Sequence, residues 1–298
     1  ILEHLEPAGV HSGDSTAVIP PFTIHKEILE EIKEKSIRLA LGLKVKGLLN
    51  IQFAIKNNDL YILEANPRAS RTMPFVAKVT GNQIIKAGTL LMLGYSIEDV
   101  KNQTNYLNGT TNKVAIKKAI FPWSRFPAED TMLGPEMKAT GEVLGIGREF
   151  GTALNKAYSA AGVEINNKEK GIFVTLSDDK KSNFLDTIKK YIELEFTVYS
   201  TQGTGEFLKS KGIDSIIVGK ANDTGQTSLS IIDEKLVSLV INTPTYANEL
   251  TDGWKIRRLS HETGIAVVSS VREADAFIEA FLKRNSVLED MDAIQNVS

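Results

Sequence analysis

Alternating strand and helix patterns in the second half of the sequence constrain the fold most. After residue 170, short apolar runs rich in β-branched residues alternate with longer segments of helical periodicity. The spacing predicts strands at 171–176, 195–200, 214–218, 237–242 and 264–269, and helices near 180–192, 203–211, 253–262 and 272–284. A strand that returns through a crossover helix joins a parallel sheet, so this half is predicted to be an open α/β domain with a mostly parallel sheet.

The first half shows a helix followed by a hairpin. Residues 24–41 place apolar side chains at helical spacing, and residues 49–56 alternate between apolar and polar side chains. "NND" at 57–59 predicts a turn, and a second strand follows at 60–66. Further along, the patterns predict helical structure over 68–95, a strand at 112–121, a helix at 148–161 and a hydrophilic linker at 162–170. Two domains are therefore expected, 1–163 and 164–298.

Composition excludes several classes of function. A net charge of −2 lacks the basic face that nucleic acids require, so no nucleic-acid partner is expected. The sequence has no cysteine, which excludes disulfides and thiolate metal sites and suits a reducing compartment. No apolar run reaches the roughly 18 residues of a membrane span, so no membrane partner is expected.

The hairpin predicts a cluster of metal ligands. Taking residues 57–59 as the turn gives three cross-strand pairs: Lys56–Leu60, Gln52–Glu64 and Asn50–Asn66. Opposed side chains have Cβ atoms about 5 Å apart, which is close enough to share one ion. A carboxylate with amide oxygens suits Mg²⁺ or Mn²⁺ better than Zn²⁺.

A phosphate clamp is predicted directly after this hairpin. Pro67 suits the first position of a helix that Asn66 would cap. Arg68 and Arg71 would then lie one turn apart at a helix N-terminus, and forked guanidinium groups match phosphate oxygens. Spacing alone supports equally well a capped helix with two surface arginines.

Three long motifs carry a resemblance to a known family. They are "EHLEPAGVHSGDS", "GLLNIQFAIKNNDLYILEANPRASRTMPFVAKVTG" and "LGPEMKATGEVLGIG". They closely resemble the large subunit of carbamoyl-phosphate synthetases, at the end of its second ATP-grasp unit, followed by a methylglyoxal-synthase-like regulatory domain. The resemblance covers essentially the whole chain, tightly to about residue 162 and more loosely beyond. It implies a fragment that lacks the first synthetase half, the oligomerisation region and most of the second nucleotide lid.

The resemblance implies an ATP-dependent ligase. In this family the second ATP-grasp unit phosphorylates carbamate with ATP to give carbamoyl phosphate. Gln52, Glu64 and Asn66 match the positions that hold the metal ions on the nucleotide phosphates, and Gln52 and Glu64 also count as ATP contacts. Arg68 and Arg71 match the catalytic arginines. The fragment by itself is expected to be inactive.

A turn near the N-terminus matches a nucleotide contact of the family. In "GVHSGDS", Gly9, Val10, His11 and Ser12 are the candidate ATP contacts. Without the resemblance, an ordinary turn with Asp14 or Ser15 as a cap is the better reading. His11 has no partner histidine at ligand spacing, so a metal-ligand role is rejected.

The resemblance also implies partners and a cellular role. A separate small subunit, a glutamine amidotransferase, would supply ammonia, which makes the synthase glutamine-hydrolysing. The product would feed pyrimidine synthesis, arginine synthesis or both, in the cytoplasm. The sequence does not separate these pathways.

The second domain is expected to bind a nucleotide effector. A Gly-containing turn, "STQGTG", links a strand to a helix, where backbone amides favour phosphate. Six residues match the nucleoside monophosphate site of the family: Lys181, Thr201, Thr204, Lys220, Asn242 and Thr243. UMP is expected rather than IMP. Pro244 stands where some relatives have a hydroxyl.

Two further readings stay in view. Glu6 and Asp14 match acids of the family's ornithine site, but Lys118 stands where a third acid aligns, and its charge would repel an ornithine ammonium. The second domain also resembles methylglyoxal synthase, a lyase, although its "GKANDTGQ" and "INTPTYAN" loops lack an acidic catalytic pair. The chain alone can also be read as a nucleotide-sensing module.

Overall fold

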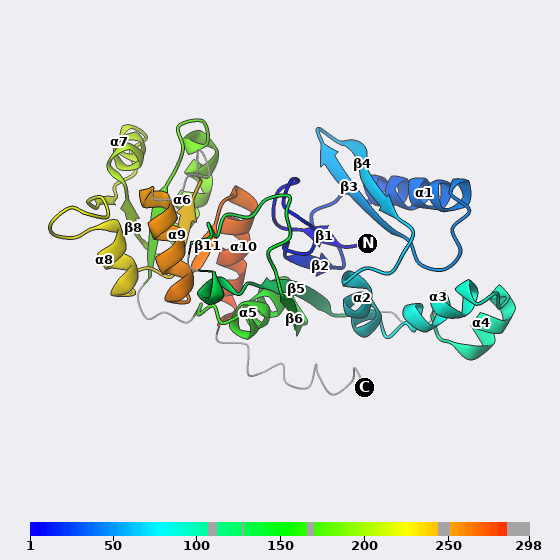
Figure 1. The fold of residues 1–298 in the computed structure, drawn as a ribbon. Helices are drawn as coiled ribbons and strands as arrows, with labels where there is room; N and C mark the ends of the chain where they lie inside the picture. The colour runs from blue at the N-terminus through cyan, green and yellow to red at the C-terminus, as the bar shows by residue number, and fades with distance from the viewer. Residues whose placement is uncertain (107–111, 127, 166–169, 244–250, 285–298) are drawn as a thin grey trace. The chain divides into compact units, whose positions relative to one another are not determined.

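The computed structural model describes residues 1–106, 112–126, 128–165, 170–243 and 251–284 (Figure 1). Its contacts divide the chain into two compact units. Unit 1 contains Ile1–Glu3 and Ala17–Ala115, and unit 2 contains His4–Thr16 and Ile116–Asp290. The domain boundary between residues 163 and 164 stays a prediction.

Helices, one hairpin and a short separate strand form the described part of unit 1. Its elements are β2 (Ala17–Ile19), α1 (Lys26–Gly42), β3 (Asn50–Lys56), β4 (Asp59–Asn66), α2 (Thr72–Thr80), α3 (Ile84–Met92) and α4 (Ile97–Gln103), while β1 (Glu3–His4) lies at the border of the two units. Helix α1 confirms the first predicted helix, with Ile32 buried and ion pairs Lys33–Glu30 and Lys35–Glu31 along the helix. Within the described ranges, no helix is long and apolar enough to cross a membrane.

The turn of the hairpin is shorter than predicted. Strand β3 ends at Lys56 and β4 begins at Asp59, and these two residues pair with each other. Asn57 and Asn58 form the connection with φ of +53° and +67°. Two successive left-handed residues match the twist of a two-residue hairpin, and asparagine tolerates that conformation. The predicted pair Lys56–Leu60 is therefore wrong.

A parallel sheet forms the centre of unit 2. Its strands are β7 (Gly171–Thr175), β8 (Thr197–Ser200), β9 (Ile216–Ile217), β10 (Leu239–Asn242) and β11 (Ala266–Val268). Its helices are α6 (Leu185–Glu193), α7 (Gln202–Ser210), α8 (Ser228–Asp233), α9 (Asp252–Glu262) and α10 (Val271–Leu282), and a 3₁₀ turn η2 spans Lys181–Phe184. The order is β11-β10-β7-β8-β9, with every described pairing parallel. The predicted open, mostly parallel sheet is confirmed.

Both faces of the central strands β7 and β10 are buried. Phe173 and Val240 pack with Ile231 of α8 and Ile256 of α9 in one apolar cluster. Ile172 has the opposite orientation in β7 and is also fully buried. A parallel strand covered on both sides reads as a continuous apolar run, which is why the sequence pattern identified it.

Unit 2 also contains two further strands, a 3₁₀ turn and a helix, which the sequence patterns located only in part. These are β5 (Val114–Ile120, from its third residue onward), a 3₁₀ turn η1 (Trp123–Arg125), β6 (Gly141–Gly147) and α5 (Phe150–Ala160). Strand β6 was not predicted, because its glycines weaken a strand pattern. The glycine is needed at Gly145, where any Cβ would collide with the carbonyl oxygen of Ala153 in α5.

Candidate functional site

One face of the hairpin carries the predicted metal ligands. Gln52 pairs with Glu64, and Asn50 pairs with Asn66, as predicted. Directly opposed side chains in an antiparallel pair project to the same side of the ribbon. One carboxylate and its amide neighbours therefore share one face of unit 1.

A β-bulge sets this register. Phe53 pairs with Ile62, and the next pair is Gln52–Glu64, so Leu63 is an extra residue in β4. With the two-residue turn and no bulge, Gln52 would face Leu63, and Glu64 would point to the opposite face. The predicted pairing is correct because the bulge compensates for the overestimated turn. Bulges commonly re-aim a side chain near functional sites.

The donor set on this face fits a hard divalent cation. Glu64 is exposed and Gln52 and Asn66 are partly buried, so their oxygens are accessible to a solvated ion. Among the described residues, no group of three His, Cys, Asp or Glu could hold a metal. A metal at this face would therefore depend on one carboxylate, the amides and oxygens of a bound nucleotide.

The two arginines do not lie on a helix together. Helix α2 begins at Thr72, so Arg71 is its N-cap residue and Arg68 lies in the preceding loop. The predicted start at Pro67 with an Asn66 cap is wrong, and so is the helical turn between the arginines. The physical reason is Pro74: in a helix beginning at Pro67 its ring would clash with the preceding turn, whereas three residues into α2 it is tolerated. The region 68–95 is likewise two helices, separated at Gly81 with φ of +67°.

Both arginines follow Asn66, one of the predicted metal ligands, within five residues in the sequence. The backbone N–H of Arg68 donates to Asn66 O at 2.8 Å, which turns the chain sharply after β4. Arg68 Nη1 contacts Ala69 O at 3.1 Å, and both arginine side chains are exposed. Exposed guanidinium groups next to hard-cation ligands are suited to an anionic, phosphate-bearing substrate.

The predicted ATP-contact turn belongs to unit 2. His11 Nδ1 accepts from Gly13 N at 3.0 Å, and His11 O accepts from Asp14 N at 2.9 Å. Gly9 has φ of +110°, a conformation that favours glycine. Val10 N donates to Pro7 O at 3.3 Å. These bonds define a compact turn that fixes the imidazole, and the ATP contacts of Gly9, Val10, His11 and Ser12 stay a prediction.

Asp14 is a structural acid in this turn. Its side chain is 1% exposed, and its two oxygens accept from Lys138 N at 2.8 Å and Ala139 N at 2.9 Å. Each carboxylate oxygen thus accepts one hydrogen bond from a backbone amide. The prediction that Asp14 caps its own turn is wrong. The Asp14 carboxylate instead binds the backbone of Lys138 and Ala139, more than 120 residues away in the sequence.

The ammonium group of Lys118 interacts with two carboxyl groups of the protein, those of Glu6 and Glu273. Its Nζ is 4.5 Å from the ring centroid of Tyr158, and Glu6 and Glu273 are its Coulombic partners. Burial raises the pKa of Glu6 to about 7, with Glu273 raising it further and Lys118 opposing the change. Burial likewise raises the pKa of Glu273. The cluster of Glu6, Lys118, Tyr158 and Glu273 thus has its own internal ammonium.

The predicted effector residues converge at the carboxyl edge of the parallel sheet. Thr201 and Thr204 follow β8, and Lys220 follows β9. Asn242 is the last residue of β10, and Thr243 comes directly after it. Two of the threonine hydroxyls accept hydrogen bonds from the protein backbone. Thr204 Oγ1 accepts from Leu176 N at 3.1 Å, and Thr243 Oγ1 accepts from Ser177 N at 2.8 Å.

Lys181 and Lys220 supply positive charge to this edge. Lys181 Nζ donates to Gly203 O at 2.8 Å and pairs with Asp178 at 2.6 Å, with its side chain 13% exposed. Lys220 is exposed, and its backbone N–H donates to Asp223. Open parallel sheets bind ligands at this edge. Pro244 lies outside the described residues.

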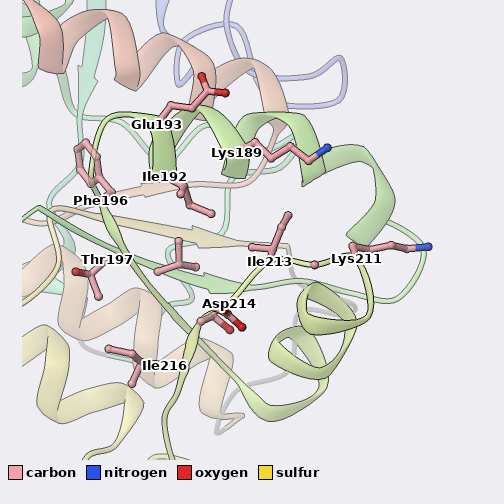
Figure 2. Close-up of a pocket in the computed structure, with 12 residues that line it drawn as sticks. Lys189, Ile192, Glu193, Phe196, Thr197, Lys211, Ile213, Asp214 and Ile216 are labelled. Carbon is pink, nitrogen blue, oxygen red and sulfur yellow. The ribbon is translucent and has the colours of Figure 1, made fainter.

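A groove of about 690 Å³ opens elsewhere on unit 2, where β8 and β9 begin (Figure 2). Lys189 and Lys211 line it together with Glu193 and Asp214, around an apolar floor that includes Ile213. The two lysines and two carboxylates cancel in charge, which disfavours phosphate. The groove contains none of the predicted effector residues.

Sequence reasoning missed three residues at these sites. Arg257 donates to Asn242 Oδ1 at 2.9 Å, Asp130 pairs with Arg257, and Glu273 joins Lys118. Glu273 stands three residues after Ser270, the N-cap residue of helix α10, and this spacing is typical of a helix start. The burial of Arg257 leaves no such mark, because the buried positions of α9 are mostly polar: Ile256, Arg257, Arg258 and Ser260.

Two domain families match the chain. The family described as "Carbamoyl-phosphate synthase L chain, ATP binding domain" matches residues 2–100, which include the hairpin. The family described as "MGS-like domain" matches residues 183–269, which include strands β8 to β11 of the parallel sheet. The fold class is thus an ATP-grasp segment followed by an MGS-like α/β domain, as predicted.

Similar proteins agree with this assignment. A carbamoyl phosphate synthase large chain, C-terminal section, of Aquifex aeolicus is 39% identical over 97% of this chain and 56% of its own length. A carbamoyl phosphate synthase large chain of Micrococcus luteus is 41% identical over 94% of this chain and 27% of its own length. The C-terminal section of the carbamoyl phosphate synthase large chain of Methanocaldococcus jannaschii is 39% identical over 94% of this chain and 46% of its own length.

Over 94–97% of its length the chain is similar to carbamoyl phosphate synthase large chains and their C-terminal sections. It spans about half the length of the C-terminal sections and about a quarter of the long relative.

Proposed function

We propose that this chain contains part of the carbamate-phosphorylating site of a carbamoyl phosphate synthase, with a nucleotide-effector domain. The observation that supports the first part is the Gln52–Glu64 pair beside Arg68 and Arg71. The bulge at Leu63 is needed for that pairing, and a purely structural hairpin would not need Glu64 on this face.

The chemistry proposed is transfer of the γ-phosphoryl group of ATP to carbamate. A carbamate oxygen forms a bond to phosphorus while the bond from phosphorus to the bridging oxygen breaks, and ADP leaves with that electron pair. Carbamate is already an anion, so no base is needed. Arg68 and Arg71 would orient carbamate and neutralise charge on the transferred group, which accounts for catalysis by positioning.

Gln52, Glu64 and Asn66 would hold Mg²⁺ or Mn²⁺. The bound cation would neutralise charge on the nucleotide phosphates. The protein residues orient that charge because cross-strand pairing fixes Gln52 and Glu64, and Asn66 directly precedes the sharp turn at Arg68. Gly9, Val10, His11 and Ser12 are proposed as contacts to the nucleotide.

The 298-residue chain by itself is expected neither to hydrolyse ATP nor to bind it tightly. Glu64, Arg68 and Arg71 are exposed in the described structure, and charge attraction is weak in water. Calorimetry with MgATP should give a Kd above about 1 mM. Micromolar binding that requires Mg²⁺ would contradict this expectation.

The complete protein is proposed to take ammonia from a glutamine-hydrolysing small subunit. Its product would enter pyrimidine or arginine synthesis in the cytoplasm. The names of the relatives support the synthase activity, and the subunit and pathways follow from the family resemblance. The internal ammonium of Lys118 near Glu6 argues against activation by ornithine, since it already neutralises the acid that would bind it.

Unit 2 is proposed to bind a nucleoside monophosphate at the carboxyl edge of its sheet, UMP rather than IMP. Lys181, Lys220, Thr201, Thr204, Asn242 and Thr243 lie at the ends of parallel strands or at the start of a helix. Thr201 is the N-cap residue of α7, where backbone amides complement phosphate. Lysine attraction for a dianion should weaken as salt rises.

Lys220→Ala is expected to weaken the response of the complete enzyme to UMP about tenfold or more, since a charge-assisted contact contributes about 1.5–3 kcal/mol. The measurement is activity against UMP concentration, with Lys209→Ala, an exposed lysine on α7, as the matched control. Thr204→Ala should also weaken the response, but it leaves Leu176 N without its acceptor, so Thr204→Ser controls for stability. Unchanged UMP responses in both Lys220→Ala and Thr204→Ala would reject this site.

A further inference from the structure

One buried guanidinium joins the predicted effector edge to a distant segment of unit 2. Arg257 of α9 is 4% exposed. Its Nη1 donates to Asn242 Oδ1 at 2.9 Å, its Nε to Asp130 Oδ1 at 3.0 Å and its Nη2 to Asp130 Oδ2 at 2.5 Å. All three residues are buried or nearly so, and the guanidinium therefore holds both partners in one fixed geometry.

The contact fixes the orientation of Asn242. A guanidinium can only donate, so the carbonyl oxygen of the amide must face Arg257. The NH₂ group of Asn242 is then the end that can donate to a ligand oxygen. Asn242 ends β10 beside Thr243, at the edge proposed for the effector.

Asp130 connects in turn to the residues around His11. Lys138 Nζ donates to Asp130 O at 2.8 Å, and the backbone N–H of Lys138 donates to Asp14 at 2.8 Å. His11 N donates to Gly134 O at 2.8 Å. The segment 130–139 is thus bonded at one end to Arg257 and along its length to the turn at residues 9–15.

We propose that Arg257 is a positioning residue that couples the effector edge to the 9–15 turn. It orients Asn242 for the ligand, and its ion pair with Asp130 connects that orientation to the segment that holds His11 and Asp14. The nature of the ligand rests on the proposed function, while the connection between Asn242 and the turn does not.

The geometry gives a reason for coupling. Arg257 is packed and its fork is rigid, so a ligand that shifts Asn242 changes the fit of the guanidinium to Asp130. Residues joined in one hydrogen-bonded network are energetically coupled, and the coupling between two ligand sites is reciprocal. The adjacent Arg258 holds the same region by donating to Trp123 O at 2.7 Å and Phe126 O at 2.8 Å, without contacting Asn242.

That difference provides a matched control. Amide hydrogen exchange at residues 9–15 is measured on the 298-residue chain with and without UMP. UMP should slow exchange there several-fold in the wild type and in Arg258→Lys. In Arg257→Lys the UMP Kd should rise about tenfold, and at saturating UMP the change at 9–15 should be lost. In Asp130→Asn, UMP should still bind, but residues 9–15 should no longer respond.

Persistence of the wild-type response in Arg257→Lys or Asp130→Asn would overturn the inference. If the wild-type chain does not bind UMP, the effector proposal fails, and a ligand-free arm tests the connection. Asn242→Ala should then speed exchange at residues 9–15 in the wild-type background and have no such effect in Asp130→Asn. No effect of Asn242→Ala in the wild-type background would reject the connection itself.

Discussion

Glu64→Gln in the complete large chain is expected to abolish formation of carbamoyl phosphate, a loss of at least about a hundredfold. The substitution keeps the shape and a hydrogen-bonding oxygen but removes the carboxylate of the Gln52–Glu64 pair. Without it, a divalent cation would have only neutral protein ligands there. Backbone pairing in the hairpin does not depend on the side-chain charge, so the fold should persist.

The measurement is carbamoyl phosphate production from carbamate and ATP, with circular dichroism to verify folding. Glu98→Gln provides the matched control, because Glu98 is an exposed acid on α4 of the same unit. Activity of Glu64→Gln close to that of the wild type would show that this face does not hold the essential metal.

Lys118→Met is expected to destabilise unit 2 by about 3 kcal/mol at pH 8 and by much less at pH 5. Removing the cation of a largely buried ion cluster leaves its opposite charges uncompensated, a loss of about 3–5 kcal/mol for fully buried pairs. Here the uncompensated groups are Glu6 and Glu273, which are partly buried. At pH 5 protonation of these carboxyl groups removes the negative charge that Lys118 would otherwise compensate.

The wild-type protein should show a related pH dependence. Burial and Glu273 raise the pKa of Glu6 from 4.5 to about 7. Between these values the folded state binds more protons than the unfolded state, so the free energy of unfolding falls as pH rises from about 4.5 to about 7. The effect is at most about 3 kcal/mol. Glu6→Gln should flatten this slope.

Chemical unfolding followed by tryptophan fluorescence measures both effects, because Trp123 and Trp254 lie in unit 2. Lys209→Met, which removes an exposed lysine, is the control and should leave stability unchanged. A Lys118→Met variant equally destabilised at pH 5 and pH 8 would contradict the proposed charge balance. An unchanged slope in Glu6→Gln would assign the titration to another group.

The sheet of unit 2 could be predicted because its central strands β7 and β10 are nearly continuous apolar runs. Ile172, Phe173 and Val174 are all fully buried, and each run is separated from the next by helix-forming sequence. Helix α8 was missed because six residues carry less than two turns of periodicity.

The hairpin site shows a different limit. The Gln52–Glu64 pair was predicted, but a bulge is a property of two paired strands and leaves no clear mark in either sequence. The start of α2 could have been found from Pro74, which restricts where a helix can begin. The Asp130–Arg257 pair joins residues 127 apart, a separation that local patterns do not reveal.

The central proposal is that Gln52, Glu64 and Asn66, with Arg68 and Arg71, form the site where phosphate passes between ATP and carbamate. Its most direct test is the reverse step, formation of ATP from ADP and carbamoyl phosphate by the complete large chain. The expected result is ATP formation by the wild type and the Glu98→Gln control, and its loss in Glu64→Gln and Arg71→Met. Undiminished ATP formation by Glu64→Gln and Arg71→Met would contradict the proposal.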